Sequence, residues 1–385
     1  MNILHITTFL QGGAGRIITD LAIYEKRKGN NVFIVCNDKE ETGYINYDEY
    51  LKKLKDMNIN VYRVNSTFKR DIYLNINAVS FVRKVILEKN IDIIHTHAAV
   101  PSFIAINARE GISNRYIPVL QTMHGWGRNK RAEQENMDIT IIKELDKLIT
   151  VSKSDRNFMI KEGINEKLID VIYNGVEDKV YEDNICDEIT EDIDKYKRNG
   201  YKILGMIGTV CERKNQILLI EAFKNINKKV FCPIIGDGKL ISELKEKCVK
   251  LGFSDSIKFY GYREDASKYL KYFDYQIVTS LSEGFGIVIV ESFREKTPVI
   301  VSDIEVFREL ICDRENGYLF ESNNKASLAD IVNNVLDKKY ERKESITNKA
   351  YEYYNNSFKI GKMFFNYDRE YNKLLDKSKK YEVVI

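Results

Sequence analysis

Several features are missing from this sequence, and each absence excludes a class of protein. No run of about 18 apolar residues occurs, so no segment is predicted to span a membrane and any membrane contact would be peripheral. The six cysteines form no CxxC pair, which argues against a disulfide framework or a zinc site and favours a reducing cytosol. The first residues lack the basic start and apolar core of a signal peptide. We therefore expect a cytoplasmic protein.

The charges nearly balance. Sixty basic and 57 acidic residues leave a formal net charge of +3, which is too small to indicate a nucleic-acid partner. The slight basic excess lies in the first half of the chain, which is compatible with peripheral contact at the inner face of a membrane. A length of 385 residues with 44% apolar residues is typical of a globular protein with two domains.

The stretch 275–301 has the clearest organisation. An apolar run over 275–279 predicts a buried strand, and an apolar-periodic segment over 287–293 predicts a helix, with a second strand at 298–301. This order is one unit of a parallel α/β sheet. The loop between strand and helix contains two glycines, which let a ligand approach the backbone, and the start of a helix favours an anion such as phosphate.

Two carboxylates flank this loop, Glu283 before the helix and Glu291 within it. Carboxylates repel a phosphate, but they accept hydrogen bonds from the paired hydroxyls of a sugar or a ribose. The stretch therefore predicts a site for a sugar nucleotide. The alternative is an ordinary strand–helix unit whose glutamates cap and solvate the helix.

The segment SEGFGIVIVES resembles the signature of the family-four retaining glycosyltransferases of the GT-B fold (glycosyl transferases group 1). That signature has two glutamates separated by seven residues, with Gly-aromatic-Gly after the first. The resemblance implies that Glu283 contacts the donor sugar as a catalytic residue and that Glu291 holds the ribose. It also implies that Gly284, Phe285 and Gly286 belong to the donor site. The expected fold is α/β, with two Rossmann-like doubly wound domains facing across a cleft.

A second glycine-rich loop follows the predicted strand Ile3–Phe9 and precedes a helix pattern that begins at Ile17. Its sequence is not the dinucleotide-binding fingerprint, so alone it is a weak sign of phosphate or substrate contact. The resemblance implies that Gly13 in this loop contacts the donor or the acceptor.

Three further candidates follow predicted strands of the first domain. His97 ends the strand 91–97, where open α/β sheets bind ligands, although a local structural hydrogen bond explains it equally well. We expect His95 and His97 to point apart and not to share a metal ion. The resemblance implies that His124, after the strand 119–123, lies near the reacting sugar carbon; the alternative is a structural turn residue. Arg128, in a short basic loop, is a candidate acceptor contact or simply a solvated cation.

The second domain begins with the strand 202–207 and a loop that contains Arg213 and Lys214. Clustered cations at a helix entrance suit a diphosphate. Lys214 matches the lysine of the resembled family, whereas Thr209 stands where that family usually has arginine. Arg213 either replaces the missing arginine or points into solvent.

We place residues 1–176 in an acceptor-side domain and 177–357 in a nucleotide-sugar domain, with a helix in 358–385 packing back on the first. The linker after residue 177 shows little apolar periodicity, and four large apolar residues of the last helix are expected to be core: Met363, Phe364, Tyr367 and Tyr371.

The expected function is transfer of a sugar from a nucleotide-diphosphate donor, with UDP as the expected nucleotide, to a glycan or lipid-linked acceptor in bacterial surface polysaccharide synthesis. Neither a metal nor a cofactor is expected. The alternatives are a nucleotide-sugar epimerase of the same architecture and a non-catalytic nucleotide-sugar-binding protein.

Overall fold

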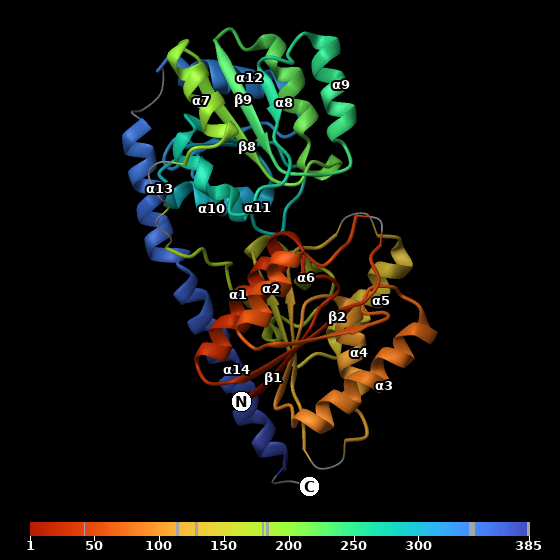
Figure 1. Cartoon of the computed structure of the whole chain (residues 1–385). Coiled ribbons are helices and arrows are strands. Elements are labelled where there is room, and N and C mark those ends of the chain that lie inside the picture. The colour runs from red at the N-terminus through yellow and green to blue at the C-terminus, as the bar shows by residue number, and fades with distance from the viewer. Residues whose placement is uncertain are drawn as a thin grey trace. The chain divides into compact units, whose positions relative to one another are not determined.

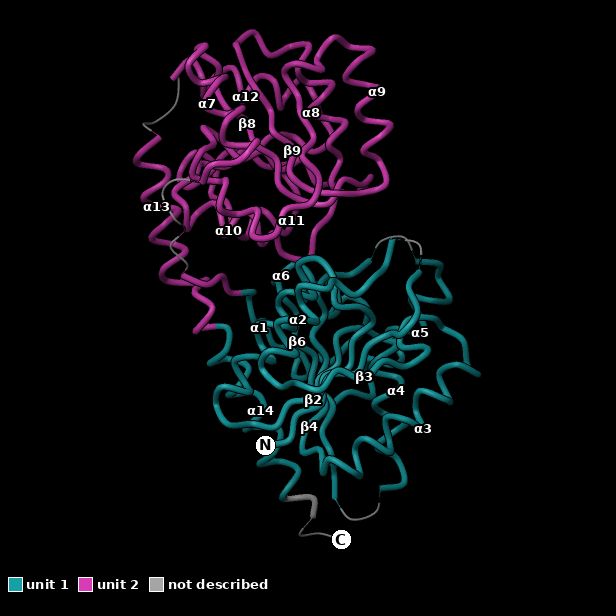
Figure 2. The backbone as a smooth tube through the Cα atoms, in the orientation of Figure 1, with its two compact units in different colours: residues 1–174, 363–385 teal, residues 175–362 magenta. Residues whose placement is uncertain are grey.

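The structure, a computed structural model, describes residues 1–41, 43–112, 115–127, 130–178, 181, 185–338 and 343–382. The chain forms two compact units (Figure 2). Unit 1 consists of residues 1–174 and 363–385, and unit 2 consists of residues 175–362. Unit 1 is therefore discontinuous in sequence.

In the described residues, unit 1 contains a parallel sheet with the strand order β3-β2-β1-β4-β5-β6-β7. Its strands are β1 (Asn2–Ile6), β2 (Asn31–Asn37), β3 (Asn60–Val64), β4 (Ile93–Thr96), β5 (Val119–Met123), β6 (Lys147–Thr150) and β7 (Ile169–Val171). Its helices are α1 (Gly12–Arg27), α2 (Asp48–Asp56), α3 (Ile72–Lys89), α4 (Ala99–Arg109), α5 (Ala132–Lys143), α6 (Lys153–Lys161) and most of α14 (Ile360–Glu382).

Helix α1 starts earlier than the sequence predicts. The glycines expected in a loop form its first turn, and Gly12 has a φ of +56°. A Cβ at Gly15 would lie 2.6 Å from the backbone of Leu10, so the glycine is required where the helix crosses the preceding chain. The close approach of helix to chain explains the glycine at position 15.

Strand β1 shows how the sheet of unit 1 separates two different faces. Leu4 and Ile6 join the apolar cluster that includes residues of α3 and α4. His5, between them, is fully buried on the opposite face, where it contacts Glu25 of α1. Helix α14 lies on the same side as α1 (Figure 1), and the rings of Tyr24 and Phe364 stack with centroids 4.1 Å apart.

In the part of the chain that the structure describes, unit 2 has a second parallel sheet, in the order β10-β9-β8-β11-β12-β13. Its strands are β8 (Lys202–Ile207), β9 (Val230–Ile235), β10 (Ile257–Phe259), β11 (Tyr275–Val278), β12 (Val299–Ser302) and β13 (Tyr318–Phe320). Its helices are α7 (Glu188–Arg198), α8 (Gln216–Ala222), α9 (Ile241–Leu251), α10 (Ile287–Arg294), α11 (Glu305–Arg308), α12 (Lys325–Leu336) and α13 (Lys343–Ser357).

Helix α7 corrects the expectation of a linker without apolar periodicity. Ile189 and Ile193, four residues apart, are both fully buried in unit 2. Asp187 caps the helix by accepting hydrogen bonds from the amides of Ile189 and Thr190. A narrow apolar stripe in a charged segment is easily overlooked, but one such stripe with a good cap is sufficient for a short packed helix.

Both sheets have the strand order of a doubly wound fold, with a switch point between β1 and β4 in unit 1 and between β8 and β11 in unit 2. At such a point the loops from neighbouring strands leave in opposite directions, and ligands bind at the carboxyl ends of the strands. His97 follows β4, whereas Lys214 and Glu283 follow β8 and β11. The fold therefore brings several predicted site residues to its switch points.

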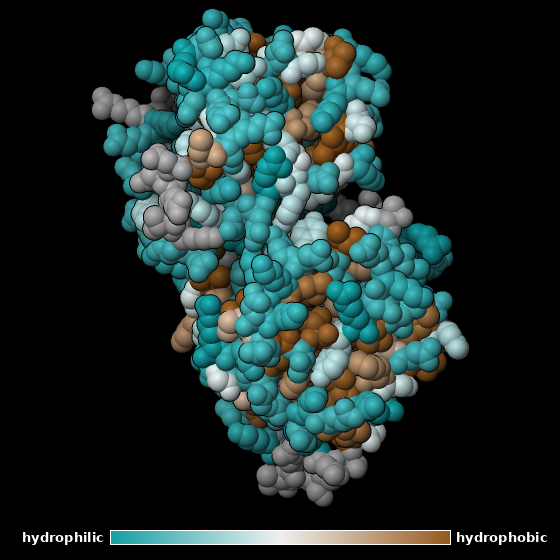
Figure 3. Space-filling view, viewed as in Figure 1, coloured by the Kyte–Doolittle hydropathy of each residue, from teal (hydrophilic) through white to brown (hydrophobic). Residues whose placement is uncertain are grey.

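The surface is mainly hydrophilic on the face shown in Figure 3, with small separate groups of hydrophobic residues. This agrees with a chain in which 30% of the residues are charged. Among the described helices, none combines the length and the apolar character needed to cross a lipid bilayer.

Candidate active site

Two loops of unit 2 meet at its switch point and are hydrogen-bonded to each other. The hydroxyl of Thr279, after β11, donates to the carbonyls of Lys214 and Asn215 at 2.8 and 2.9 Å. The amide of Leu281 donates to the carbonyl of Arg213 at 2.8 Å. The loop that carries the cations and the loop that carries Glu283 therefore form one structure.

Two glycines make room for this arrangement at the ends of β8 and β9. A Cβ at Gly236 would lie 2.0 Å from the carbonyl oxygen of Gly208, and one at Gly238 would lie 2.0 Å from that of Val210. Both contacts are with backbone, which cannot move aside cheaply. These glycines are required because the loops that follow β8 and β9 pack closely against each other.

Glu283 lies at the centre of the joined loops. Its carboxylate is 2.6 Å from the Nζ of Lys214 and 2.6 Å from a guanidinium nitrogen of Arg213. Ser280 donates a third contact at 2.8 Å. Burial raises the pKa of Glu283, but the charges of Lys214 and Arg213 and the hydrogen bonds outweigh it and hold this pKa below its ordinary value. Glu283 is thus an ionised, nearly buried acceptor.

Arg213 is both paired and exposed. Besides its ion pair with Glu283, it donates to the carbonyl of Ser282 at 3.0 Å, although its side chain stays 47% exposed. Thr209, where the resembled family usually has arginine, is exposed, and its carbonyl accepts a hydrogen bond from Gln216. The structure therefore places a guanidinium beside Lys214, but from a different position in the loop.

Residues 284–286, which follow Glu283, contribute to the candidate site through their backbone more than through their side chains. Gly286 precedes α10 with a φ of +103°, and a Cβ there would lie 2.8 Å from the ring of Phe307. The ring of Phe285 is buried against Phe358, with centroids 5.8 Å apart. Gly284 is half-buried at the loop, and Glu291 is 6% exposed inside α10. The ring of Phe285 is therefore part of the packing of unit 2.

In unit 1 the predicted residues lie at the ends of β1, β4 and β5. Gly13 is exposed in the first turn of α1. His97 donates its backbone amide to the carbonyl of Ile6, and its ring contacts that of His124, with nitrogens 3.1 Å apart. Arg128 lies outside the described residues. The neighbouring cation Lys130 lies 3.3 Å from the centroid of the Trp126 ring and 2.9 Å from Asp138.

The expectation that His95 and His97 point apart is wrong. In a strand, alternate residues share a face, and the two ring centroids are 4.2 Å apart. His5, His95 and His97 come close enough for their nitrogens to surround a cation. However, every one of their ring nitrogens has a hydrogen-bond partner in the protein: Glu25, Tyr371, Thr122, His124 or one another. The cluster is satisfied without an ion.

Sequence reasoning missed His5, Glu25 and the hydroxyls of the α14 tyrosines. Two signals were present. His5 interrupts an otherwise apolar buried strand, and Glu25 falls on the buried stripe of α1 that includes Ile18 and Leu21. Tyr367 and Tyr371 are core residues as expected, but their hydroxyls also contact Thr122, His95 and Glu25.

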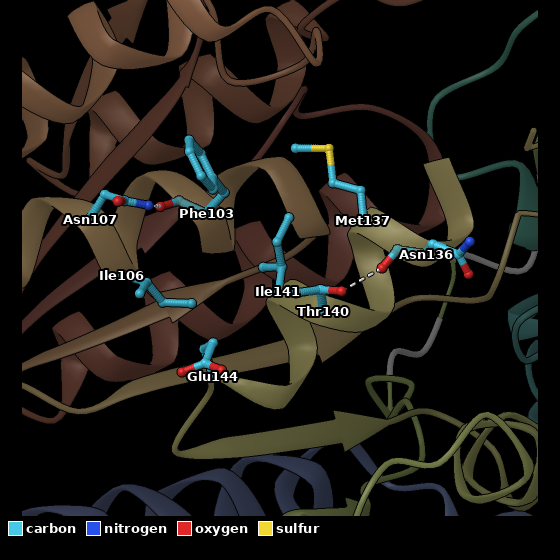
Figure 4. A pocket seen from close by; sticks show the side chains of 8 residues that line it. All are labelled: Phe103, Ile106, Asn107, Asn136, Met137, Thr140, Ile141 and Glu144. Carbon is cyan, nitrogen blue, oxygen red and sulfur yellow. Dashed lines mark hydrogen bonds between the residues drawn. The ribbon is translucent and has the colours of Figure 1, made fainter. Parts of the chain in front are cut away.

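A groove elsewhere on unit 1 has a different character (Figure 4). It lies between α4 and α5, and no predicted site residue lines it; its lining is Phe103, Ile106, Asn107, Asn136, Met137, Thr140, Ile141 and Glu144. The hydroxyl of Thr140 and the amide of Asn107 are bonded to their own helices. This groove offers little to recognise a nucleotide or a sugar.

Two family models match this chain. Residues 11–180 match the Glycosyltransferase Family 4 model, and residues 188–353 match the model of glycosyl transferases group 1. The chain belongs to this family. The assignment makes it an enzyme of the glycosyltransferase class that uses nucleotide sugars, and it disfavours the alternative of a non-catalytic binding protein.

Individual relatives of this glycosyltransferase are distant. An uncharacterised glycosyltransferase of Methanocaldococcus jannaschii is 28% identical over 75% of this chain and 79% of that protein. A UDP-Gal:alpha-D-GlcNAc-diphosphoundecaprenol alpha-1,3-galactosyltransferase of Escherichia coli is 28% identical over 66% of this chain and 69% of that protein. The similarity in sequence is too low to transfer a substrate.

The solved structures support the fold. Anabaena HepE, in complex with UDP, is similar with a TM-score of 0.79 at 20% identity, over 97% of this chain and 100% of that one. The lipopolysaccharide outer core galactosyltransferase WaaB is similar with a TM-score of 0.72 at 18% identity, over 96% and 98% of the two chains. This glycosyltransferase therefore has the GT-B fold.

Proposed function

We propose that this enzyme transfers a sugar from a UDP-linked donor to a glycan or lipid-linked acceptor, with retention of anomeric configuration, during assembly of a bacterial surface polysaccharide. Relatives support the class of substrates: one is named for a UDP-galactose donor and a diphosphoundecaprenol acceptor, and solved neighbours bind UDP or UDP-glucose. A lipid-linked acceptor would place the reaction in the cytoplasm, at the inner face of the membrane.

One observation carries the proposal: an ionised carboxylate, Glu283, is held between two cations at the switch point of unit 2. A diphosphate needs cations, and a sugar needs a carboxylate that accepts from its hydroxyls. The joined loops supply both within one ion-pair cluster. Unit 2 would therefore be the donor unit, with Glu291 on the ribose and the backbone from Gly284 to Gly286 near the phosphates.

In the proposed reaction the bond between the anomeric carbon and the diphosphate oxygen breaks, and the diphosphate leaves with the bonding electron pair. The acceptor hydroxyl forms the new bond to that carbon and gives its proton to the departing diphosphate oxygen. Lys214 and Arg213 would stabilise the negative charge that develops on the diphosphate. Unit 1 would contribute Gly13 and His124 to the reacting sugar, with His97 behind His124.

The first test is thermal unfolding with UDP, GDP, ADP and CMP, each alone. A ligand at a hundredfold its dissociation constant adds about 2.7 kcal/mol to the free energy of unfolding, which shifts the melting temperature by several degrees. We expect UDP to produce the shift and Glu291→Ala to lose it. If no nucleotide stabilises the enzyme, the donor site proposed here is wrong.

A second test separates the transferase from the epimerase alternative. The enzyme is incubated with UDP-sugars, with and without a lipid-diphosphate-linked sugar as acceptor, and the products are separated by mass and by sugar identity. A transferase forms a larger glycolipid and free UDP only when the acceptor is present. Conversion of one UDP-sugar into its epimer without an acceptor would contradict the proposal.

A further inference from the structure

All four histidines of this chain lie in one hydrogen-bonded network in unit 1, and three of them are buried. The network begins at Glu25 of α1, whose carboxylate is 2.7 Å from the Nε2 of His5. The Nδ1 of His5 is 3.0 Å from the Nε2 of His97, and the Nδ1 of His97 is 3.1 Å from the Nε2 of His124. Two imidazoles, those of His5 and His97, therefore connect a buried carboxylate to the predicted catalytic histidine.

The chemistry of a neutral imidazole gives this chain of contacts a direction. Such a ring has one N–H donor and one bare acceptor nitrogen. An ionised carboxylate can only accept, so a neutral His5 must carry its hydrogen on Nε2, and its Nδ1 must then accept from the Nε2 of His97. The same step repeats at His124, whose Nε2 carries hydrogen. Its Nδ1 is therefore a bare acceptor.

A second branch from Glu25 obeys the same direction. Tyr371 donates its hydroxyl hydrogen to the other carboxylate oxygen at 2.8 Å, and its oxygen is 2.7 Å from the Nδ1 of His95. The Nε2 of His95 is 2.7 Å from the hydroxyl of Thr122, which is 3.0 Å from that of Tyr367. Every proton in both branches can point toward Glu25 without conflict.

Burial favours the neutral form of three of these rings, those of His95, His97 and His124. Burial, with the charges of neighbouring histidines, lowers the pKa of His95 and of His97 well below its ordinary value. Burial also lowers the pKa of His124 to about 4. Near neutral pH these three rings thus have one hydrogen each and a definite choice between two tautomers.

The outer end of the network is open to a substrate. His124 is only partly buried, and among the described residues no group forms a hydrogen bond with its Nδ1. We propose that Glu25 is a positioning residue for sugar transfer: through His5 and His97 it holds His124 in the Nε2–H tautomer, so that the bare Nδ1 accepts a hydrogen bond from a sugar hydroxyl. This inference rests on the proposed function only in giving His124 a sugar to bind.

The test measures the tautomers directly, in the full-length enzyme labelled with ¹⁵N-histidine and without substrate. Long-range ¹H–¹⁵N correlation spectra near pH 7.5 distinguish Nδ1–H from Nε2–H, and His124→Asn identifies the signal of that residue. We expect Nε2–H at His5, His97 and His124 and Nδ1–H at His95, each with a preference of at least about tenfold. A predominant Nδ1–H tautomer at His124 would overturn the proposal.

Two variants then test the role of Glu25. Glu25→Leu removes the obligatory acceptor, and we expect the Nε2–H fraction of His124 to fall to about half, with a matching loss of transfer rate. Tyr367→Phe is the matched control, because it removes a buried hydroxyl from the other branch and should leave His124 unchanged. If Glu25→Leu folds and the tautomer of His124 persists, Glu25 does not control it. If this variant does not fold, the wild-type spectrum decides alone.

Two further results distinguish this proposal from a metal site and from the proposed function itself. Titration with Zn²⁺ alone should leave the histidine signals in place, and a shift at His5, His95 and His97 would make the cluster a metal site instead. Because the spectra need no donor, the expected tautomers with no sugar transfer would support the network and reject the function. Sugar transfer by an enzyme whose His124 is in the Nδ1–H tautomer would support the proposed function and reject the network.

Discussion

Replacing Glu283 by glutamine separates its structural role from its proposed catalytic role. Its side chain is 9% exposed and that of Lys214 is 18% exposed, so the variant leaves a poorly solvated ammonium beside a neutral amide. Breaking a fully buried pair costs about 3–5 kcal/mol, whereas an exposed pair contributes at most about 1 kcal/mol. Arg213, 47% exposed, keeps its own solvation, and the amide still accepts hydrogen bonds. We expect a loss of about 2 kcal/mol in the free energy of unfolding.

For a domain of this size that loss lowers the melting temperature by about 4–8 °C. UDP, in contrast, should bind more tightly to this variant. Once Glu283 no longer neutralises Lys214 and Arg213, both cations can meet the diphosphate, and the dissociation constant of UDP should fall about fivefold. The transfer rate should fall by about 10- to 100-fold, because a charge-assisted contact to the sugar hydroxyls is lost.

Calorimetric titration with UDP and a product assay measure these two quantities on the same preparation. Glu212→Gln is the matched control, since this carboxylate belongs to the same loop but is 63% exposed and pairs with Lys239. We expect the control to change neither quantity. If Glu283→Gln loses UDP affinity and transfer together, Glu283 only shapes the loop. Unchanged transfer would remove it from the mechanism.

Three other changes test separate parts of the structure. Gly236→Ala places a Cβ 2.0 Å from the carbonyl of Gly208, so it should destabilise unit 2 and abolish the thermal shift with UDP, whereas Gly252→Ala, where a Cβ has open space, should cost only backbone strain. Tyr371→Phe removes one donor from Glu25 and should lower the free energy of unfolding by about 1–3 kcal/mol in denaturant titrations; an unchanged midpoint would contradict a buried bond there. Acidification from pH 6.5 toward pH 4 should lower the free energy of unfolding. The reason is that the unfolded chain takes up a proton at His124 in this range, whereas the folded chain, in which burial lowers the pKa of His124 to about 4, does not. A free energy of unfolding that stays constant over this range would refute the burial of His124.

Much of the fold could be predicted because its signals are local. Buried parallel strands appear as apolar runs, and glycine turns mark where strands meet helices. The segment around Glu283 also carries a family signature. The early start of α1 and the helix α7 were mispredicted, since each depends on a packing partner: the chain at Leu10 for Gly15, and the core of unit 2 for Ile189.

The candidate site was less predictable because its contacts are long-range. The residue types of Lys214, Arg213 and Glu283 and their positions in the sequence predicted that they bind a ligand. Only the contact between the two loops that carry them shows that they also form ion pairs with one another. The histidine network needs β1 beside β4, and it needs Tyr371 placed against Glu25 although 346 positions separate them. No spacing rule within a helix or strand encodes such a pairing.

The discontinuity of unit 1 has a consequence for the order in which this enzyme can mature during synthesis. Unit 1 takes its last helix from residues that the ribosome adds only after unit 2. Until then Glu25 and His95 lack the hydroxyl of Tyr371, and the face of the sheet beneath α14 stays open to water. Domains generally fold as their chain emerges, but here the first to emerge is the last to be completed. A nascent chain that ends before residue 363 therefore lacks the helix that supplies Tyr371 to Glu25 and His95.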